Sequence, residues 1–119
     1  MKPMKLLSIL IFSLIFSSSA FAVSFDCSKA STFVEKEICS DPFLGKLDDA
    51  LSSNYKAMLG ANGISKKIVK NEQRKWLVNR NKCTNNQCLI EMYRKRIDET
   101  CDYGVPSGLH PVCTMFDDI

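Results

Sequence analysis

The cysteines constrain this chain more than any other residue type does. The sequence has 119 residues and six cysteines, all of which follow residue 22: Cys27, Cys39, Cys83, Cys88, Cys101 and Cys113. An even number of cysteines in a small exported chain indicates a disulfide framework. Each bridge over a loop of about a dozen residues adds roughly 3 kcal/mol to the free energy of unfolding. Six cysteines can pair in many ways, and the spacing alone does not choose among them.

The first 22 residues have the organisation of a secretory signal peptide. Lys2 and Lys5 precede the short apolar run 6–16, and a small-x-small motif ends at Ala22. We therefore expect cleavage after Ala22 and a single periplasmic or secreted domain over residues 23–119. The apolar run is too short to span a bilayer comfortably, and no second such run follows. No cysteine follows the expected cleavage point directly, so a lipid anchor is not expected.

Positive charge is concentrated in one segment. After residue 22 the chain has 14 basic and 13 acidic residues, whereas residues 66–82 alone hold seven basic residues and one acidic residue. This segment is either a solvated face or the contact surface for an anionic partner, such as lipid headgroups or an acidic protein. Nucleic acid is not an expected partner of an exported protein. The candidate partner-binding residues are Lys66, Lys67, Lys70 and Arg74, together with Asp102 and His110 in the tail.

Helical signals dominate the pattern, and no segment shows sustained strand alternation. Thr32 and Glu35 fit a capping box in front of a short helix that ends near Cys39. Asp41 followed by Pro42 starts a second helix. Helices are therefore expected over about 33–39, 42–59, 66–82 and 88–100, the third of them capped by Ser65. The second helix has one apolar stripe of Leu44, Leu47, Leu51, Tyr55 and Met58, and the third carries Ile68, Val69, Trp76 and Leu77. In the fourth helix Leu89, Met92, Tyr93 and Ile97 are expected to face inward.

These elements predict an all-α fold, a small disulfide-stapled bundle of about four helices. Its centre is expected to be the antiparallel pair 42–59 and 66–82. The stretch 102–119 has two prolines and two glycines without periodicity, so we expect an irregular tail held by one disulfide.

Asp48 lies among leucines on the apolar face of its predicted helix. A buried lone carboxylate is costly, so Asp48 needs a partner. In an antiparallel hairpin Arg80 comes within reach, and Arg80 shares a helix face with Gln73 and Trp76. We predict an Asp48–Arg80 contact with Trp76 packed beside it, as an internal pair that fixes helix register; the alternative is a polar active site. The predicted internal polar network is Asp48, Arg80, Gln73, Trp76, Tyr55 and Glu35.

The sequence offers little for catalysis or metal binding. Cys83 and Cys88 are separated by four residues, whereas a redox-active pair usually has two, so a structural disulfide is the leading interpretation. A metal site would need Cys101, His110 or Cys113 as further ligands. The single histidine, His110, has no nucleophile motif to serve and is expected in an exposed loop. We expect no metal, no cofactor and no enzymatic activity.

Two stretches, "FDCSKASTFVEKEICSDPFLGKLDDALSSNYKAM" and "EQRKWLVNRNKCTNNQCLIEMYRKRI", resemble the LprI-like lysozyme-inhibitor family of exported bacterial domains. The resemblance covers Phe25 to about Cys101 and leaves a cysteine-bearing tail over 102–119. The matching positions are Asp26, Cys27, Ala30, Glu35, Ile38, Cys39, Leu44, Leu47, Asp48, Tyr55, Gln73, Trp76, Arg80, Cys83, Cys88, Tyr93, Arg96 and Ile97.

The resemblance implies a small helical domain with bridges Cys27–Cys39 and Cys83–Cys88, and with them Cys101–Cys113. It also implies a protein partner, because some members bind and inhibit lysozyme in the cell envelope. The leading expectation is therefore a binding protein that occludes a lysozyme-type glycosidase without chemistry of its own. An immunity or adaptor protein that neutralises an envelope toxin is the alternative, and a small hydrolase is the least favoured function.

Overall fold

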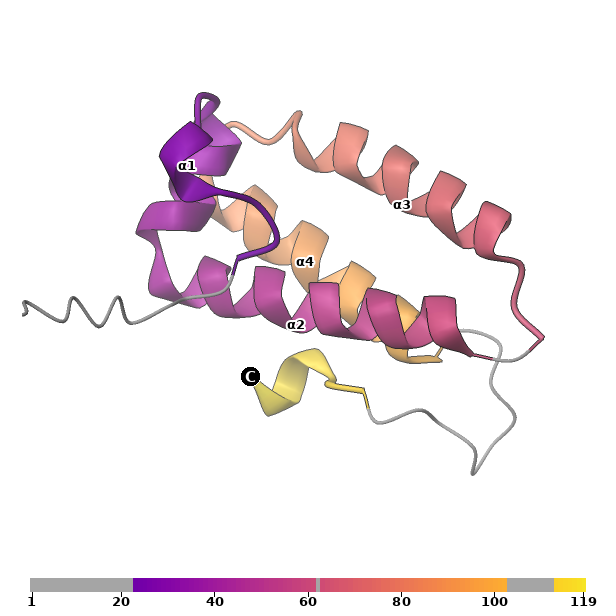
Figure 1. Ribbon diagram of the computed structural model, residues 1–119. Helices are drawn as coiled ribbons and strands as arrows, with labels where there is room; N and C mark the ends of the chain where they lie inside the picture. The colour runs from indigo at the N-terminus through magenta and orange to yellow at the C-terminus, as the bar shows by residue number, and fades with distance from the viewer. Residues whose placement is uncertain (1–22, 62, 103–112) are drawn as a thin grey trace, which may run out of the picture.

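The computed structural model describes residues 23–61, 63–102 and 113–119. The first 22 residues, with the expected signal peptide and cleavage site, lie outside this part of the chain. In order along the chain, the elements are η1 (Cys27–Lys29), α1 (Phe33–Ser40), α2 (Pro42–Gly60), α3 (Lys66–Arg80), α4 (Asn86–Asp102) and η2 (Phe116–Asp118) (Figure 1). None of the described residues forms a strand. The predicted all-α bundle of four helices is confirmed.

The ends of the helices are set by the capping residues that the sequence predicts. Thr32 Oγ1 accepts the amide of Glu35, and Glu35 Oε1 accepts the amide of Thr32, so the capping box of α1 is present. Asp41 Oδ1 accepts the amide of Phe43 at 2.8 Å, and Pro42 occupies the first position of α2. The fourth helix begins at Asn86, two residues earlier than expected, because the predicted polar turn over 84–87 is shorter.

The core lies chiefly between α2 and α4, which run parallel and side by side (Figure 1). Hydrogen bonds join Asp41 to Asn86 and Asp48 to Tyr93, a constant separation of 45 residues. The expectation of a bundle centred on residues 42–59 and 66–82 is therefore wrong. The helix α3 does run back along α2, and this return allows α4 to start beside the beginning of α2. The buried core residues are Val34, Ile38, Leu44, Leu47, Leu51, Cys83, Leu89, Tyr93 and Ile97.

The helix α3 buries much less of itself than its neighbours do. Only Val69 and Arg80 of its 15 residues are fully buried, and Trp76 and Leu77 are partly buried. Ile68, one of the apolar residues of this helix, is 53% exposed. The physical reason is the composition of α3, which has too few apolar side chains for a continuous stripe. Its packing therefore rests on single large residues at spaced positions.

Three disulfides close the structure: Cys27–Cys39, Cys83–Cys88 and Cys101–Cys113. The pairing implied by the family resemblance is confirmed. The first bridge ties η1 to α1, the second spans the turn between α3 and α4, and the third joins the end of α4 to the final segment. No helix in the described part of the chain is long and apolar enough to cross a membrane.

The final segment, residues 113–119, is here called the C-terminal strap. The side-chain amide of Asn54 pairs with the backbone of Thr114, donating to its carbonyl at 2.8 Å and accepting its N–H at 2.9 Å. The amide of Phe116 donates to Asp98 Oδ1 at 2.9 Å. The tail expected to be irregular thus contains η2, and it is held on α2 and α4. In Figure 1 the strap and α3 lie on opposite sides of this helix pair.

Candidate functional site

Three buried residues, Asp48, Arg80 and Tyr93, form a polar cluster that the exposed Ser24 joins from the N-terminal segment, and we call these four residues the buried polar centre. The Tyr93 hydroxyl donates to Asp48 Oδ1 at 2.7 Å and accepts Arg80 Nη1–H at 3.1 Å. Arg80 Nη1 itself lies 4.0 Å from Asp48 Oδ1. The predicted meeting of Asp48 with Arg80 is therefore present, but the phenol of Tyr93 stands between the two charges.

The carboxylate of Asp48 has partners at both oxygens. The Ser24 amide donates to Oδ2 and the Ser24 hydroxyl donates to Oδ1, in addition to the bond from Tyr93. Asp48 is 3% exposed and Arg80 is 6% exposed. Hydrogen bonds of this kind offset the cost of placing a charged pair away from water. Every oxygen that could act on a substrate is thus already engaged within the protein.

Tyr93 is held in its protonated form. Burial raises the pKa of Tyr93, and the neighbouring Asp48 carboxylate raises it further. The hydroxyl is therefore a hydrogen-bond donor at neutral pH. It offers neither a phenolate nucleophile nor a general base, and this argues against acid–base chemistry at the buried polar centre.

Trp76 packs against the buried polar centre from α3. Its ring meets the Tyr93 ring edge to face, with centroids 5.0 Å apart, and the Arg80 guanidinium lies 5.7 Å from the Trp76 centroid. The indole N–H donates to the carbonyl of Met92 at 3.2 Å. Trp76 thus holds α3 to α4 while its ring covers Arg80.

The other members of the predicted polar network lie nearby or serve another purpose. Gln73 Oε1 accepts Arg96 Nε–H at 3.0 Å, a second polar link between α3 and α4. Tyr55 is half-buried and faces the groove between α2 and α3. Glu35 belongs first to the cap of α1: the Thr32 hydroxyl is the main cause that lowers the pKa of Glu35, and the charge of Arg80 lowers it slightly.

A groove of about 630 Å³ runs between α2 and α3. We call it the α2–α3 groove. Its walls are mostly apolar, and the buried polar centre closes its inner end. Lys56 on α2 and Lys70 and Arg74 on α3 also border it, and all three are exposed. Because Asp48 is almost completely buried at the inner end, this groove does not present it as a solvent-open active site.

A second, wider groove lies between α3 and α4, with a volume of about 1460 Å³. Trp76 and Met92 contribute apolar surface to it. Four acidic and four basic residues border it, so it favours neither sign of charge: Glu72, Glu91, Asp98, Glu99, Lys75, Arg94, Lys95 and Arg96. Arg96 and Lys95 form ion pairs with Glu99 there.

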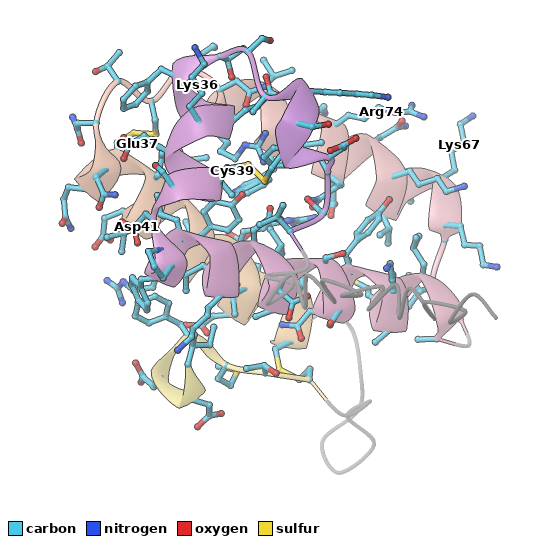
Figure 2. All side chains as sticks on the ribbon, turned by 60° about the vertical axis from the view of Figure 1, so that its left-hand side comes forward. Lys36, Glu37, Cys39, Asp41, Lys67 and Arg74 are labelled. Carbon is cyan, nitrogen blue, oxygen red and sulfur yellow. A yellow bond between two sulfur atoms is a disulfide. The ribbon has the colours of Figure 1, made fainter. Side chains whose placement is uncertain are left out.

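Of the predicted partner-binding residues, the structure brings four together on one helix. Lys66, Lys67, Lys70 and Arg74 are all exposed on α3, and we call them the basic face. Figure 2 shows Lys67 and Arg74 projecting from α3, away from Lys36 on α1. Asp102 is the last residue of α4, and nothing is described of its side chain. His110 lies outside the described residues.

The cysteines do not form a metal or thiol site. All six sulfurs are bonded in pairs, which removes the thiolates that the alternative metal site would need. Among the residues that the structure describes, no group of three or more histidine, cysteine, aspartate or glutamate side chains is arranged to hold a metal ion.

Sequence reasoning did not identify Tyr93 and Ser24 as partners of Asp48. Tyr93 was expected to face inward as part of an apolar stripe. The available signal was its hydroxyl, because a buried tyrosine usually finds a hydrogen-bond partner. Ser24 carried no such signal, since it precedes the first helix and is exposed.

Comparison with known proteins gives one match. A family model described as lysozyme inhibitor LprI matches residues 26–100, which include η1 and most of the four helices. No curated protein and no solved structure matches the chain. The C-terminal strap lies beyond the matched residues.

Proposed function

The chain belongs to the LprI family of lysozyme inhibitors, and on that premise we propose that it binds a lysozyme-type glycosidase and occludes its cleft without performing chemistry. The family is one of inhibitors, so the partner of this chain is a protein. The protein would act as a rigid wedge or cover, and affinity would come from surface complementarity.

One observation supports occlusion over catalysis. The groups of the buried polar centre bind each other. Asp48 accepts three hydrogen bonds, and Tyr93 remains protonated. Groups that are buried and bound to each other in this way are poorly placed to reach a substrate. The centre is therefore best explained as a structural connection between the N-terminal segment, α2, α3 and α4.

The three disulfides support action outside the cytoplasm. Disulfides persist in oxidising compartments such as the periplasm and are rare in the cytosol. Bridges from η1 to the end of α1, between α3 and α4, and from the end of α4 to the C-terminal strap also limit the motion of the binding surface. Such preorganisation lowers the entropy that binding costs. An exported, rigid inhibitor is consistent with both features.

A cell-wall lysis assay tests the proposal. The mature protein, residues 23–119, is mixed with lysozymes of different structural types, and the clearing of a cell-wall suspension is followed. Slower clearing that saturates with protein concentration is expected for at least one type. The matched control is the same protein after reduction and alkylation, which should lose the effect with its fold. Unchanged clearing for every type at large molar excess would refute the proposal.

The basic face favours a second candidate, the neutralisation of an acidic envelope toxin by an immunity or adaptor protein. Lysozymes are often basic overall, so long-range attraction does not bring them to this face. A protein that inhibits no lysozyme but binds a purified acidic toxin in a salt-dependent manner would establish this candidate instead.

A further inference from the structure

The basic face works against the stability of its own helix. Lys67, Lys70 and Arg74 follow one another at spacings of three and four residues, so like charges are neighbours. Lys66 and Lys67 occupy the first turn of α3, directly after the cap at Ser65. The amides at a helix N-terminus carry partial positive charge, which disfavours cations there. Folding alone therefore does not account for this arrangement.

No ion pair within the described part of the protein involves a residue of the basic face. The ion pairs in this part join Asp48 to Arg80 and otherwise lie within α4. Arg74 donates one hydrogen bond to the neutral amide of Asn71. The ammonium and guanidinium groups are therefore available to acceptors on another molecule.

The basic face borders an apolar recess. Lys70 and Arg74 on one side and Lys56 on the other flank the α2–α3 groove, whose walls include Leu59 and Leu77. Cations around an apolar recess match the usual anatomy of a protein contact, in which a buried apolar anchor is surrounded by polar groups. With a volume of about 630 Å³, the groove has room for a large side chain of a partner.

The opposite side of the molecule is already covered. The C-terminal strap lies on α2 and α4 away from α3, where Asn54 and Asp98 bind its backbone. Arg94 and Phe43 pack against the Phe116 ring of the strap. Since the strap occupies that side, the α3 side is the one that combines exposed charge with a recess.

We propose that the basic face and the α2–α3 groove form the inhibitory contact, and that the partner surface is a carboxylate-lined glycosidase cleft. This inference rests on the proposed function and names the surface that performs it. Most glycosidases cleave with a pair of carboxylates set in a cleft. Lysine and arginine donate charge-assisted hydrogen bonds to such groups. A local match of this kind holds the complex together even when the partner is basic overall.

Two double variants distinguish a specific contact at the basic face from an effect of the net charge of the protein. Lys67→Glu/Lys70→Glu alters the basic face, and Lys36→Glu/Lys46→Glu makes the same change in charge on exposed residues of α1 and α2. The inhibitor concentration that halves lysis should rise roughly ten- to a hundredfold for the first variant. It should stay within about twofold of wild type for the second. Circular dichroism and thermal melting check that both variants are folded.

A partner variant completes the experiment. In a lysozyme that the wild-type protein inhibits, one cleft carboxylate is replaced by its amide, and binding is measured by titration calorimetry. The amide should weaken binding of wild type but add no further loss for Lys67→Glu/Lys70→Glu. Equal inhibition by wild type and this variant overturns the inference while the proposed function stands. An absence of inhibition by wild type refutes the proposed function, and with it the inference.

Discussion

The hydroxyl of Tyr93 on α4 donates a 2.7 Å hydrogen bond to Asp48 on α2 and accepts one from Arg80 on α3, so it links the carboxylate to the guanidinium. The phenol is completely buried, and its ring carries the packing of Trp76. One side chain thus joins α2, α3 and α4. The consequences for stability follow from this position.

Removing the Tyr93 hydroxyl should destabilise the protein without creating a large cavity. In Tyr93→Phe, Asp48 loses its α4 donor and Arg80 loses an acceptor. A hydrogen bond to a charged group contributes about 1.5–3 kcal/mol, so a loss of this size is expected in urea unfolding. Tyr55→Phe is the matched control, because the hydroxyl of half-buried Tyr55 makes no hydrogen bond to another described residue. Equal stability of the two variants would contradict the assignment.

Removing the Asp48 carboxylate alone should destabilise the protein more than removing Asp48 and the Arg80 charge together. Asp48→Ala leaves Arg80 buried without its carboxylate, a change that typically costs about 3–5 kcal/mol. Adding Arg80→Met removes the unpaired charge and should restore part of that stability. Chemical denaturation of the two single variants and the double variant measures the coupling. Strictly additive losses would show that the two side chains act independently.

The contribution of each disulfide to the stability of the protein should increase with the length of the loop that it closes. Cys27–Cys39 and Cys101–Cys113 each span a separation of 12 residues, whereas Cys83–Cys88 spans 5. In the chain-entropy treatment the longer loops contribute about 3 kcal/mol and the short one about 2 kcal/mol. Paired replacement of each bridge by alanine, followed by thermal unfolding, gives the ranking. A larger loss at Cys83–Cys88 would assign that bridge a role beyond loop closure.

Acid should weaken the corner where α1, α2 and α4 meet. The amide of Asn86 lowers the pKa of Asp41 below its ordinary value of 3.8, and the capped amides of Phe43 and Leu44 lower it further, whereas burial opposes the shift. A depressed folded-state pKa stabilises the protein above pH 3.8, and this contribution is lost as pH falls through the lowered value.

Asp41→Asn isolates that contribution. Asparagine still caps α2, but it does not titrate. The free energy of unfolding is compared at about pH 6 and about pH 3. Wild type should lose more stability on acidification than the variant does, although partial exposure of Asp41 keeps the difference small. An identical pH dependence would show that Asp41 does not contribute.

Acidic residues at the start of α3 should stabilise the fold. In Lys66→Glu and Lys67→Glu a carboxylate meets the free amides of the first turn, which is worth about 0.3–1 kcal/mol for each change at low salt. The same replacement at Lys56, near the C-terminal end of α2, should destabilise. Thermal melting at low and high ionic strength measures both. A fall in stability for the α3 variants would show that their lysines have a structural function.

Local signals were sufficient to predict the helices but not their arrangement. The caps at Thr32, Asp41 and Ser65 act within a few residues, so the starts of α1, α2 and α3 could be predicted. The parallel pairing of α2 with α4 could not, because hydrophobic spacing identifies an apolar face without its partner. The sparse apolar content of α3 was the neglected signal. A helix that buries only Val69 and Arg80 fully cannot be the main partner of α2.

The buried polar centre could likewise be predicted only in part. The position of Asp48 among leucines was enough to predict a buried carboxylate that needs a partner, and the helix spacing brought Arg80 into range. The part of Tyr93 depended on the α2–α4 register, which only the fold defines. The Ser24 contacts depended on where the N-terminal segment crosses α2. This segment has no helical or capping pattern from which its position could be predicted.

The parallel pairing also affects the order in which the chain can fold. Because α2 packs on a helix 45 residues further along the chain, its leucine face finds no permanent cover until α4 has been made. Contacts between distant segments form late, since a long loop must close first. Until then only α1 and α3 are in place to cover part of α2. Folding of this chain therefore waits for the closure of a long loop, and we expect it to be slower than folding of a bundle whose sequential helices pair.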